Sequence, residues 1–407
     1  MSGPTISASP RFPGLDSLRA LASIAVVATH TSFWAGVYGH GTLGSAMQRL
    51  EAGVAVFFVL SGFLLSYPFV RQMCTGRRHD STGRYLWKRL LRVMPVYWVT
   101  VVAAMLLLPD NRELGAGRWV DNLLLIDLYR TGILPHGLTQ MWSLTTEVAF
   151  YVLLPVLMRL LARSLTARTW APRRLLVLLA VMSAGSLVWT YLAAGGLDQI
   201  ELWSKRGLPG YLIWFAIGIA FAVVDVDRRH RHAAGRPDSE RVVPLLGLAA
   251  SPGVCWLTAV ALFAIASTPL AGAPGLVAQG PFESVLRSAF YAAVAALVVL
   301  PSIFGPSHGA YATALAHPWL RHLGATSYSL FCCHVLVLEL EARWLGFQLF
   351  QSDPFVLFGA TLGISLVLAE VLYRLVERPF LRLKDARRAP PGPAPDTSTP
   401  SAATTSS

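Results

Sequence analysis

The chain contains about ten runs of roughly 20 apolar residues, and few folds can accommodate so many. A run of this length matches the thickness of the hydrocarbon core of a bilayer when it is helical. The runs cover residues 15–33, 53–70, 92–109, 142–161, 174–194, 208–225, 244–268, 284–304, 326–349 and 355–376. Only 14% of the 407 residues are charged, against about 25% in a soluble domain. The sequence therefore predicts an all-α integral membrane protein, a bundle of about ten transmembrane helices.

The net charge of +12 is a topology signal and does not indicate nucleic-acid binding. If the amino terminus starts in the cytoplasm, the segments on that side hold 25 Lys and Arg residues and the opposite side holds seven. Cytoplasmic loops carry such an excess of basic residues. We therefore expect both termini in the cytoplasm of a multi-pass protein of the inner or plasma membrane, with membrane lipid as a partner and no nucleic acid.

The chain has one long membrane domain with short polar ends. We expect residues 13–385 to form this domain, and residues 1–12 and 386–407 to be disordered. The carboxyl-terminal segment is rich in Pro, Ala, Ser and Thr and has no hydrophobic anchor. The four cysteines show neither a disulfide nor a zinc spacing, and no metal site or nucleotide-hydrolase motif is present. The sequence thus predicts no metal and no bound cofactor.

His30 lies deep inside the first apolar run, where an imidazole is costly unless a partner stabilises it. Arg19 precedes it by 11 residues, close to three helical turns, so both side chains face the same way about 16 Å apart along the axis. One helix face then carries a cation near its start and a titratable base deep inside. A buried histidine with a structural partner and an arginine that anchors the membrane interface would explain the same pattern.

Two further segments carry polar or small residues near the first span. Arg89 and Arg92 are three residues apart, so they share one side of a helix at the inner face. A pair of guanidinium groups suits a polyanion, because arginine binds phosphate in a bidentate manner. Ordinary positive-inside charge is the alternative. Ser61-Gly62 in the second span would allow close packing of helices.

Glu147 lies about five residues inside an apolar helix that starts at the outer face. His30 lies about 15 residues above the inner start of its helix, roughly 22 Å at 1.5 Å per residue. Glu147 lies roughly 7 Å below the outer edge of a core about 30 Å thick, at nearly the same depth. We therefore expect Glu147 to meet His30, to fix its tautomer and to leave the other ring nitrogen as a base.

Several of these segments, taken in order, resemble the type-three family of membrane acyltransferases, which includes O-antigen and macrolide O-acyltransferases. The matching residues run from 11 to about 380. They are Leu15-Asp16-Ser17-Leu18-Arg19-Ala20-Leu21 with His30, Gly53-Val54, Phe57 to Phe63, Arg89 and Arg92 before Pro95 and Tyr97, Trp142-Ser143-Leu144 with Glu147, and Leu323-Gly324 with Ser327-Tyr328-Ser329 and His334. Two positions depart from the family pattern: Ser17 replaces a more usual glycine, and Phe331-Cys332-Cys333 replaces a usual Tyr-Leu-Trp before His334.

The resemblance implies an enzyme that moves an acyl group from a cytoplasmic donor of the acyl-CoA type, a co-substrate, to a hydroxyl of a sugar, glycolipid or glycosylated metabolite. It implies that His30 is the catalytic histidine and that Glu147 is the acidic residue of the Trp-Ser-Leu segment. Arg19, Arg89 and Arg92 would hold the donor. Residues of the same motifs are candidates for supporting roles: Asp16, Ser61, Trp142, Ser143 and His334.

A proton-coupled transporter of an anionic or glycan substrate is the alternative from a different functional class. His30 and Glu147 would then relay protons, and the arginines would bind the substrate. The chain lacks the internal repeat that marks many transporters, and the ordered motifs span nearly its whole length. Both observations favour the acyltransferase.

Overall fold

The computed structural model describes residues 12, 14–38, 40–76, 81–163, 170–195, 206–275, 277 and 279–386. These residues form helices joined by turns and contain no strand. The all-α prediction is therefore confirmed for the described part of the chain. The expected disorder at residues 1–12 and 386–407 falls almost entirely outside it. Phe12, which is described, packs edge-on against the rings of Phe63 and Tyr67.

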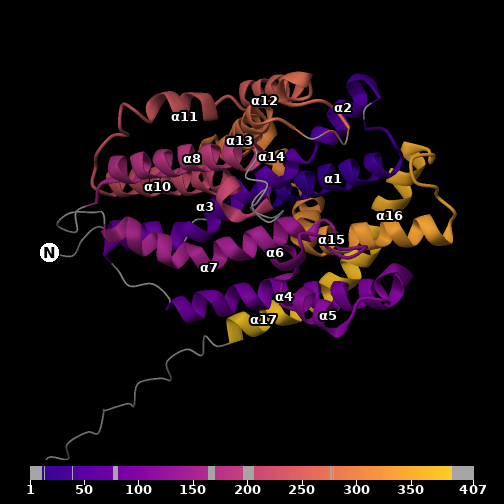
Figure 1. Ribbon diagram of the computed structural model, residues 1–407. Coiled ribbons are helices and arrows are strands. Elements are labelled where there is room, and N and C mark those ends of the chain that lie inside the picture. The colour runs from indigo at the N-terminus through magenta and orange to yellow at the C-terminus, as the bar shows by residue number, and fades with distance from the viewer. Residues whose placement is uncertain are drawn as a thin grey trace, which may run out of the picture.

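Many of the long helices run roughly side by side (Figure 1). The long helices are α1 (Gly14–Trp34), α3 (Ala52–Thr75), α4 (Thr82–Leu107), α7 (Met141–Arg163), α8 (Pro172–Ala194), α10 (Leu212–Ala233), α12 (Pro252–Ala266), α13 (Pro281–Phe304), α15 (Pro318–Trp344) and α16 (Pro354–Leu372). The shorter ones are α2 (Gly41–Arg49), α5 (Ala116–Leu123), α6 (Asp127–Thr131), α11 (Val243–Ala249), α14 (Ala310–Leu315) and α17 (Arg378–Ala386). Single turns are η1 (Pro109–Asn111), η3 (Leu208–Tyr211), η4 (Pro269–Ala271) and the π-helical η5 (Tyr373–Glu377).

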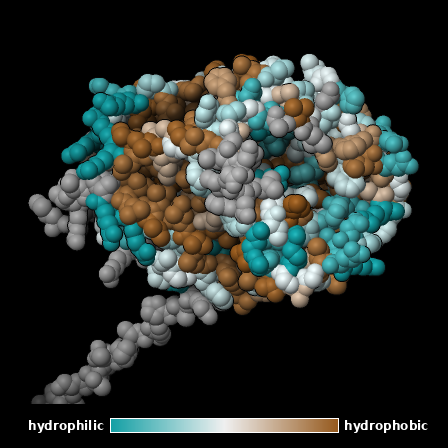
Figure 2. Space-filling model, viewed as in Figure 1, coloured by the Kyte–Doolittle hydropathy of each residue, from teal (hydrophilic) through white to brown (hydrophobic). Residues whose placement is uncertain are grey.

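Eight helical segments of the described chain are long and apolar enough to cross a membrane, or nine if α11 and α12 count as one span. The expected span at 244–268 is this pair, whose two helices meet at an angle of 88° near Pro252. The expected span at 15–33 forms α1, which is long enough but less apolar, because it carries Asp16, Arg19 and His30. On the visible face, hydrophobic residues cover the middle and hydrophilic ones lie toward both ends of the helices (Figure 2).

Helices α3 and α10 pack with their backbones close together, and glycines permit it. A Cβ atom on Gly62 would lie 2.3 Å from the carbonyl oxygen of Phe215, and one on Gly218 would lie 2.1 Å from that of Val59. Backbones can approach this closely only where no side chain intervenes. The packing role expected for Ser61-Gly62 is therefore confirmed. Gly324 does the same for α15 against α1, where a Cβ would meet the carbonyl oxygen of Asp16.

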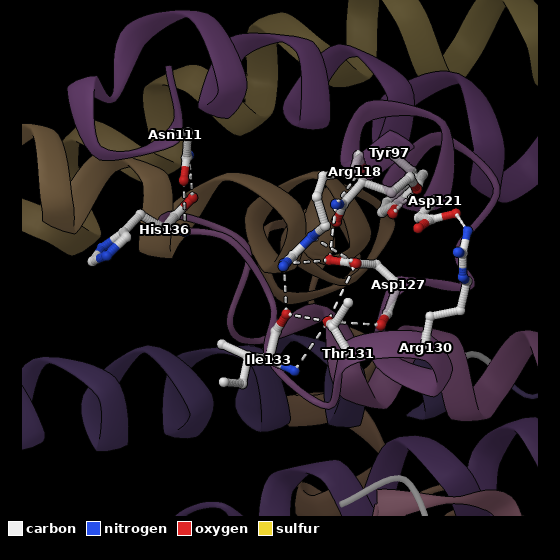
Figure 3. Close-up of polar contacts among 10 residues, drawn as sticks. Tyr97, Asn111, Arg118, Asp121, Asp127, Arg130, Thr131, Ile133 and His136 are labelled. Carbon is white, nitrogen blue, oxygen red and sulfur yellow. Dashed lines mark hydrogen bonds and ion pairs between the residues drawn. The ribbon is translucent and has the colours of Figure 1, made fainter. Parts of the chain in front are cut away.

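A network of charged and polar residues fixes the segment between α4 and α7, as Figure 3 shows. Arg118 binds the buried carboxylate of Asp127 with its Nε 2.8 Å away, and Arg130 binds Asp121 at 2.7 Å. At the end of this segment, the Gly137 N–H donates to Glu339 of α15 at 2.7 Å. Gln140 Nε2 donates to the carbonyl oxygen of Cys332 at 2.8 Å, so the start of α7 is attached to the middle of α15.

Candidate active site

Three arginines predicted to bind a donor line one cavity of about 270 Å³. Arg19 comes from the second turn of α1, and Arg89 and Arg92 come from the first half of α4. The cavity also reaches Ser143 near the start of α7 and Val54 near the start of α3. Ser143 and Tyr151 of α7 both line the cavity, and the helix axis between them is about 12 Å long. The structure thus brings together residues from helices that lie far apart in the sequence.

The three guanidinium groups differ in their partners. Arg19 lies 3.5 Å from the carboxylate of Asp16, one turn earlier on α1. Arg92 forms an ion pair of 2.5 Å with Glu377. Arg89 stacks over the ring of Tyr85 at 6.0 Å, and its buried Nε has no hydrogen-bond partner among the described residues. A buried guanidinium N–H without a partner is costly, so Arg89 is the arginine most ready to receive a ligand anion.

Glu377 is a member of this site that sequence reasoning missed. It lies in the π-helical turn η5, is 1% exposed, and accepts a hydrogen bond of 2.7 Å from Ser329 Oγ. Its charge balances Arg92 from the far end of the chain. The sequence shows Glu377 as a carboxylate directly after the last apolar run, but it does not show that Arg92 is its partner.

Glu147 lines the arginine cavity and accepts a hydrogen bond from Ser61 Oγ of α3. It also interacts electrostatically with Arg19. Ser61 therefore combines a place at the close helix contact with a polar contact to the site. Glu147, Ser61 and Ser143 all face the cavity, as the prediction of a shared site requires.

His30 and His334 form the second part of the site. Nδ1 of His30 lies 3.1 Å from Nε2 of His334 and 2.9 Å from the carbonyl oxygen of Val26. Nδ1 of His334 lies 2.8 Å from the carbonyl oxygen of Phe331. A carbonyl oxygen can only accept, so both Nδ1 atoms carry hydrogens in the neutral pair, and Nε2 of His334 accepts from His30. Nε2 of His30 has no hydrogen-bond partner in the described part of the chain, so its lone pair is free there.

The predicted contact between His30 and Glu147 is wrong: His30 pairs with His334, and Glu147 pairs with Ser61. The depth estimate assumed that α7 starts at the membrane surface. Gln140, just before α7, instead bonds to Cys332, two residues before His334, so α7 starts at the depth of the histidine pair. Glu147 lies seven residues further, about 10 Å nearer the arginines.

The cavity approaches the histidine pair through Phe331. Phe331 lines the cavity, and the centroid of its ring lies 6.0 Å from that of His334. His334 is fully buried, whereas His30 is only partly buried. Trp142 does not line this cavity but an adjacent one, in contact with the ring of Tyr211. Within the described residues, no group of three or more His, Cys, Asp or Glu side chains is arranged to hold a metal ion.

The sequence matches the protein family described as "Acyltransferase domain" over residues 12–374. The acyltransferase MdmB of Streptomyces mycarofaciens is 26% identical over 411 residues, which cover 96% of each chain. No solved structure shows a significant match.

Two further relatives are longer proteins. A putative O-acetyltransferase of Staphylococcus aureus (strain COL) is 22% identical over 398 residues, covering 90% of this chain and 57% of the relative. The peptidoglycan O-acetyltransferase OatA of Listeria monocytogenes is 24% identical over 389 residues, covering 90% of this chain and 55% of the relative. The chain thus spans little more than half of these two proteins.

Proposed function

The chain belongs to the type-three acyltransferase family, whose match covers residues 12–374, and from this premise we propose its reaction and its residues. It is a multi-pass membrane acyltransferase. In our proposal it moves an acyl group from acyl-CoA to a hydroxyl of a sugar, glycolipid or glycosylated metabolite. The named O-acetyltransferase relatives support an oxygen acceptor.

One observation carries this proposal: a cavity lined by three arginines reaches Phe331, whose ring lies beside His334, the partner of His30. Acyl-CoA carries phosphate groups at one end and its thioester at the other. Arginine is the residue best suited to phosphate, because its planar group offers several donors in a fixed geometry. Arg89 would form the strongest new contacts, since it has an unsatisfied N–H, while Arg19 and Arg92 add positive charge.

His30 would act as the general base. Its Nε2 removes the proton from the acceptor hydroxyl, and the hydroxyl oxygen attacks the thioester carbonyl carbon. The tetrahedral intermediate then breaks its C–S bond, and the proton on Nε2 of His30 passes to the departing thiolate to give free CoA. The acyl group ends as an ester on the acceptor. A positioned general base contributes about 10²–10⁴ in rate.

His334 would be a positioning residue. Its Nδ1–H donates to the carbonyl oxygen of Phe331, so its Nε2 is an acceptor that keeps the hydrogen of His30 on Nδ1. Only this tautomer of His30 presents a basic Nε2. The imidazolium ion that His30 becomes during transfer also gains from the same hydrogen bond. Glu147 and Ser61 would hold the guanidinium of Arg19 toward the donor.

We also propose that α1 spans the membrane, which brings the number of spans to ten and both termini to the cytoplasm. The 21 residues of α1 extend about 32 Å, enough to cross the hydrocarbon core. Its polar side chains face other helices: Arg19 the cavity and His30 the fully buried His334. With this topology the starts of α1 and α4, which carry the three arginines, open toward cytoplasmic acyl-CoA.

Binding of radiolabelled acetyl-CoA to the purified protein tests the proposal. We expect wild-type protein and His30→Ala to bind acetyl-CoA equally well, whereas Arg89→Ala binds it about ten- to a hundred-fold more weakly. In the presence of a hydroxyl acceptor, wild-type protein should release CoA thiol, and His30→Ala should release it about 10²–10⁴ times more slowly. If wild-type protein does not bind acetyl-CoA, or if His30→Ala releases thiol at the wild-type rate, the proposed function is wrong.

A further inference from the structure

A second and larger cavity of about 410 Å³ adjoins the arginine cavity. Its wall is formed by the starts of α3, α7, α10 and α13 and by the end of α8. Val54 lines both cavities, and Trp142 and Ser143 are neighbours that line one cavity each. The second cavity therefore meets the first near the histidine pair, away from the ends of α1 and α4 that carry the three donor arginines.

Aromatic side chains dominate the wall of this second cavity. They are Trp142, Trp189, Tyr211, Trp214 and Tyr291. The rings of Trp142 and Tyr211 are 5.3 Å apart, and those of Tyr211 and Trp214 are 4.9 Å apart, so they form one continuous surface. The flat face of an aromatic ring packs well against the C–H face of a saturated ring. A concave site with such walls and a few polar groups is typical of small-molecule binding.

Two arginines in this wall have no acidic partner among the described residues. Arg206 is exposed and lies two residues before the turn η3, and Arg287 is partly buried on α13. The one carboxylate in the wall, Glu51, accepts a hydrogen bond of 3.0 Å from Tyr291. Arg287 is partly buried beside aromatic rings that weaken screening by water, so its guanidinium group favours an anion, and the exposed Arg206 adds further positive charge.

The positions of the polar groups in the wall would orient a bound molecule. Glu51 immediately precedes α3, and Gly53 of that helix packs against Ala22 and Val26 of α1. The carbonyl oxygen of Val26 lies 2.9 Å from Nδ1 of His30, so Glu51 lies on the side of the cavity toward the base. Arg206 is exposed and lies toward solvent. A bound molecule with one ring hydroxyl at Glu51 and its negative group at the arginines would present a neighbouring hydroxyl to the thioester in the adjoining cavity.

We propose that this aromatic cavity is the acceptor site and that it selects a hydroxylated ring that carries a carboxylate or a phosphate. The inference rests on the proposed transferase function and adds to it the charge of the acceptor. Arg206 and Arg287 bind the acidic group, and the tryptophans and tyrosines bind the ring face. Glu51 accepts a hydrogen bond from a hydroxyl next to the reacting one, which leaves the proton of the reacting hydroxyl for His30.

Four sugars that share one ring test the proposal: glucose, glucuronate, glucose 1-phosphate and glucosamine. Full-length protein in lipid nanodiscs avoids competition from sugar-headed detergents, and saturation transfer from protein to sugar protons gives the Kd of weak ligands. We expect glucuronate and glucose 1-phosphate to bind at least about tenfold more tightly than glucose. Their advantage should fall as salt is raised, and glucosamine should gain nothing over glucose.

Variants test whether the aromatic cavity causes the preference for acidic sugars. Arg206→Gln and Arg287→Gln should each reduce the preference for the two acidic sugars and leave the Kd of glucose unchanged. Arg112→Gln, which changes an exposed arginine outside both cavities, is the matched control and should behave as wild type. Trp142→Ala should weaken all sugars together. Equal Kd values for glucose and the acidic sugars, or a preference that survives the double Arg206→Gln and Arg287→Gln variant, would overturn the proposal.

Acetyl-CoA binding separates the two proposals. Arg287→Gln should bind acetyl-CoA as wild type does, because Arg287 does not line the arginine cavity. If wild-type protein binds acidic sugars selectively but binds no acetyl-CoA, the reaction is wrong and the selectivity of the cavity stands. If it binds acetyl-CoA but shows no preference among the sugars, the proposed reaction stands and the acceptor site is wrong.

Discussion

Arg89 and Arg92 are three residues apart on one helix, yet the structure predicts different consequences when each is replaced by alanine. Arg92 is paired with Glu377, whose side chain is 0% exposed. Arg92→Ala would leave this carboxylate buried and unpaired, a change that typically costs about 3–5 kcal/mol. The Arg92 side chain is 25% exposed, so we expect the lower end, about 3 kcal/mol, or more than a hundred-fold in the unfolding equilibrium. Arg89→Ala removes no ion pair and should leave stability near wild type.

Two measurements on the same purified variants check this prediction: thermal unfolding in a fixed detergent and the Kd of acetyl-CoA. Arg89→Ala should weaken donor binding about ten- to a hundred-fold without changing the melting temperature. Arg92→Ala should melt several degrees lower. The double variant Arg92→Ala, Glu377→Gln should recover most of the stability, because the amide is neutral and can keep the bond from Ser329. It should still bind the donor more weakly. A melting temperature for Arg92→Ala equal to wild type would refute the reasoning.

Three further outcomes follow from the geometry. His30→Ala should reduce the rate of acyl transfer at saturating acetyl-CoA by about 10²–10⁴, and His334→Leu should reduce it by about ten- to a hundred-fold. His334→Gln should reduce it least, because the amide oxygen can replace Nε2 as an acceptor. Equal rates for the leucine and glutamine variants would contradict the role of His334. Gly324→Ala should destabilise by about 1–3 kcal/mol or more, since its Cβ would meet the backbone of Asp16, whereas Gly359→Ala has open space and should be neutral in the same thermal-unfolding assay. A cysteine introduced into residues 234–242, which join α10 to α11, should be labelled only from the cytoplasmic side, and labelling from outside would overturn the proposed topology.

The spans and the residue types of the site could be predicted from sequence, because each depends on a local property. A run of about 20 apolar residues identifies a membrane helix whatever it packs against. Arg19, Arg89 and Arg92 stand out since cations are rare near such runs, and the structure places all three at one cavity. His30 stands out for the same reason.

The pairings within the site could not be predicted, because they depend on where helices start and how they cross. The predicted depth of Glu147 was wrong because α7 starts inside the bundle, where Gln140 donates a hydrogen bond to α15. The contact of His30 with His334 depends on the close crossing of α1 and α15 at Gly324. Glu377 reaches Arg92 from a π-helical turn, whose wider spacing of hydrogen bonds has no clear sequence pattern.

The carboxylates around the arginine cavity fit an enzyme that must bind its donor and also release CoA. Asp16 lies near Arg19, Glu377 binds Arg92, and Glu147 acts on Arg19 from the cavity wall. Each carboxylate lowers the cost of keeping a guanidinium partly buried while no donor is bound. Each also reduces the net attraction for phosphate, because the arginine already has a partner. Arg89, which lacks one, would then provide most of the donor affinity. Three arginines without carboxylate partners would bind the phosphates of the donor more tightly. Because CoA carries the same phosphates as acyl-CoA, the product would also be bound more tightly, and its release would limit turnover.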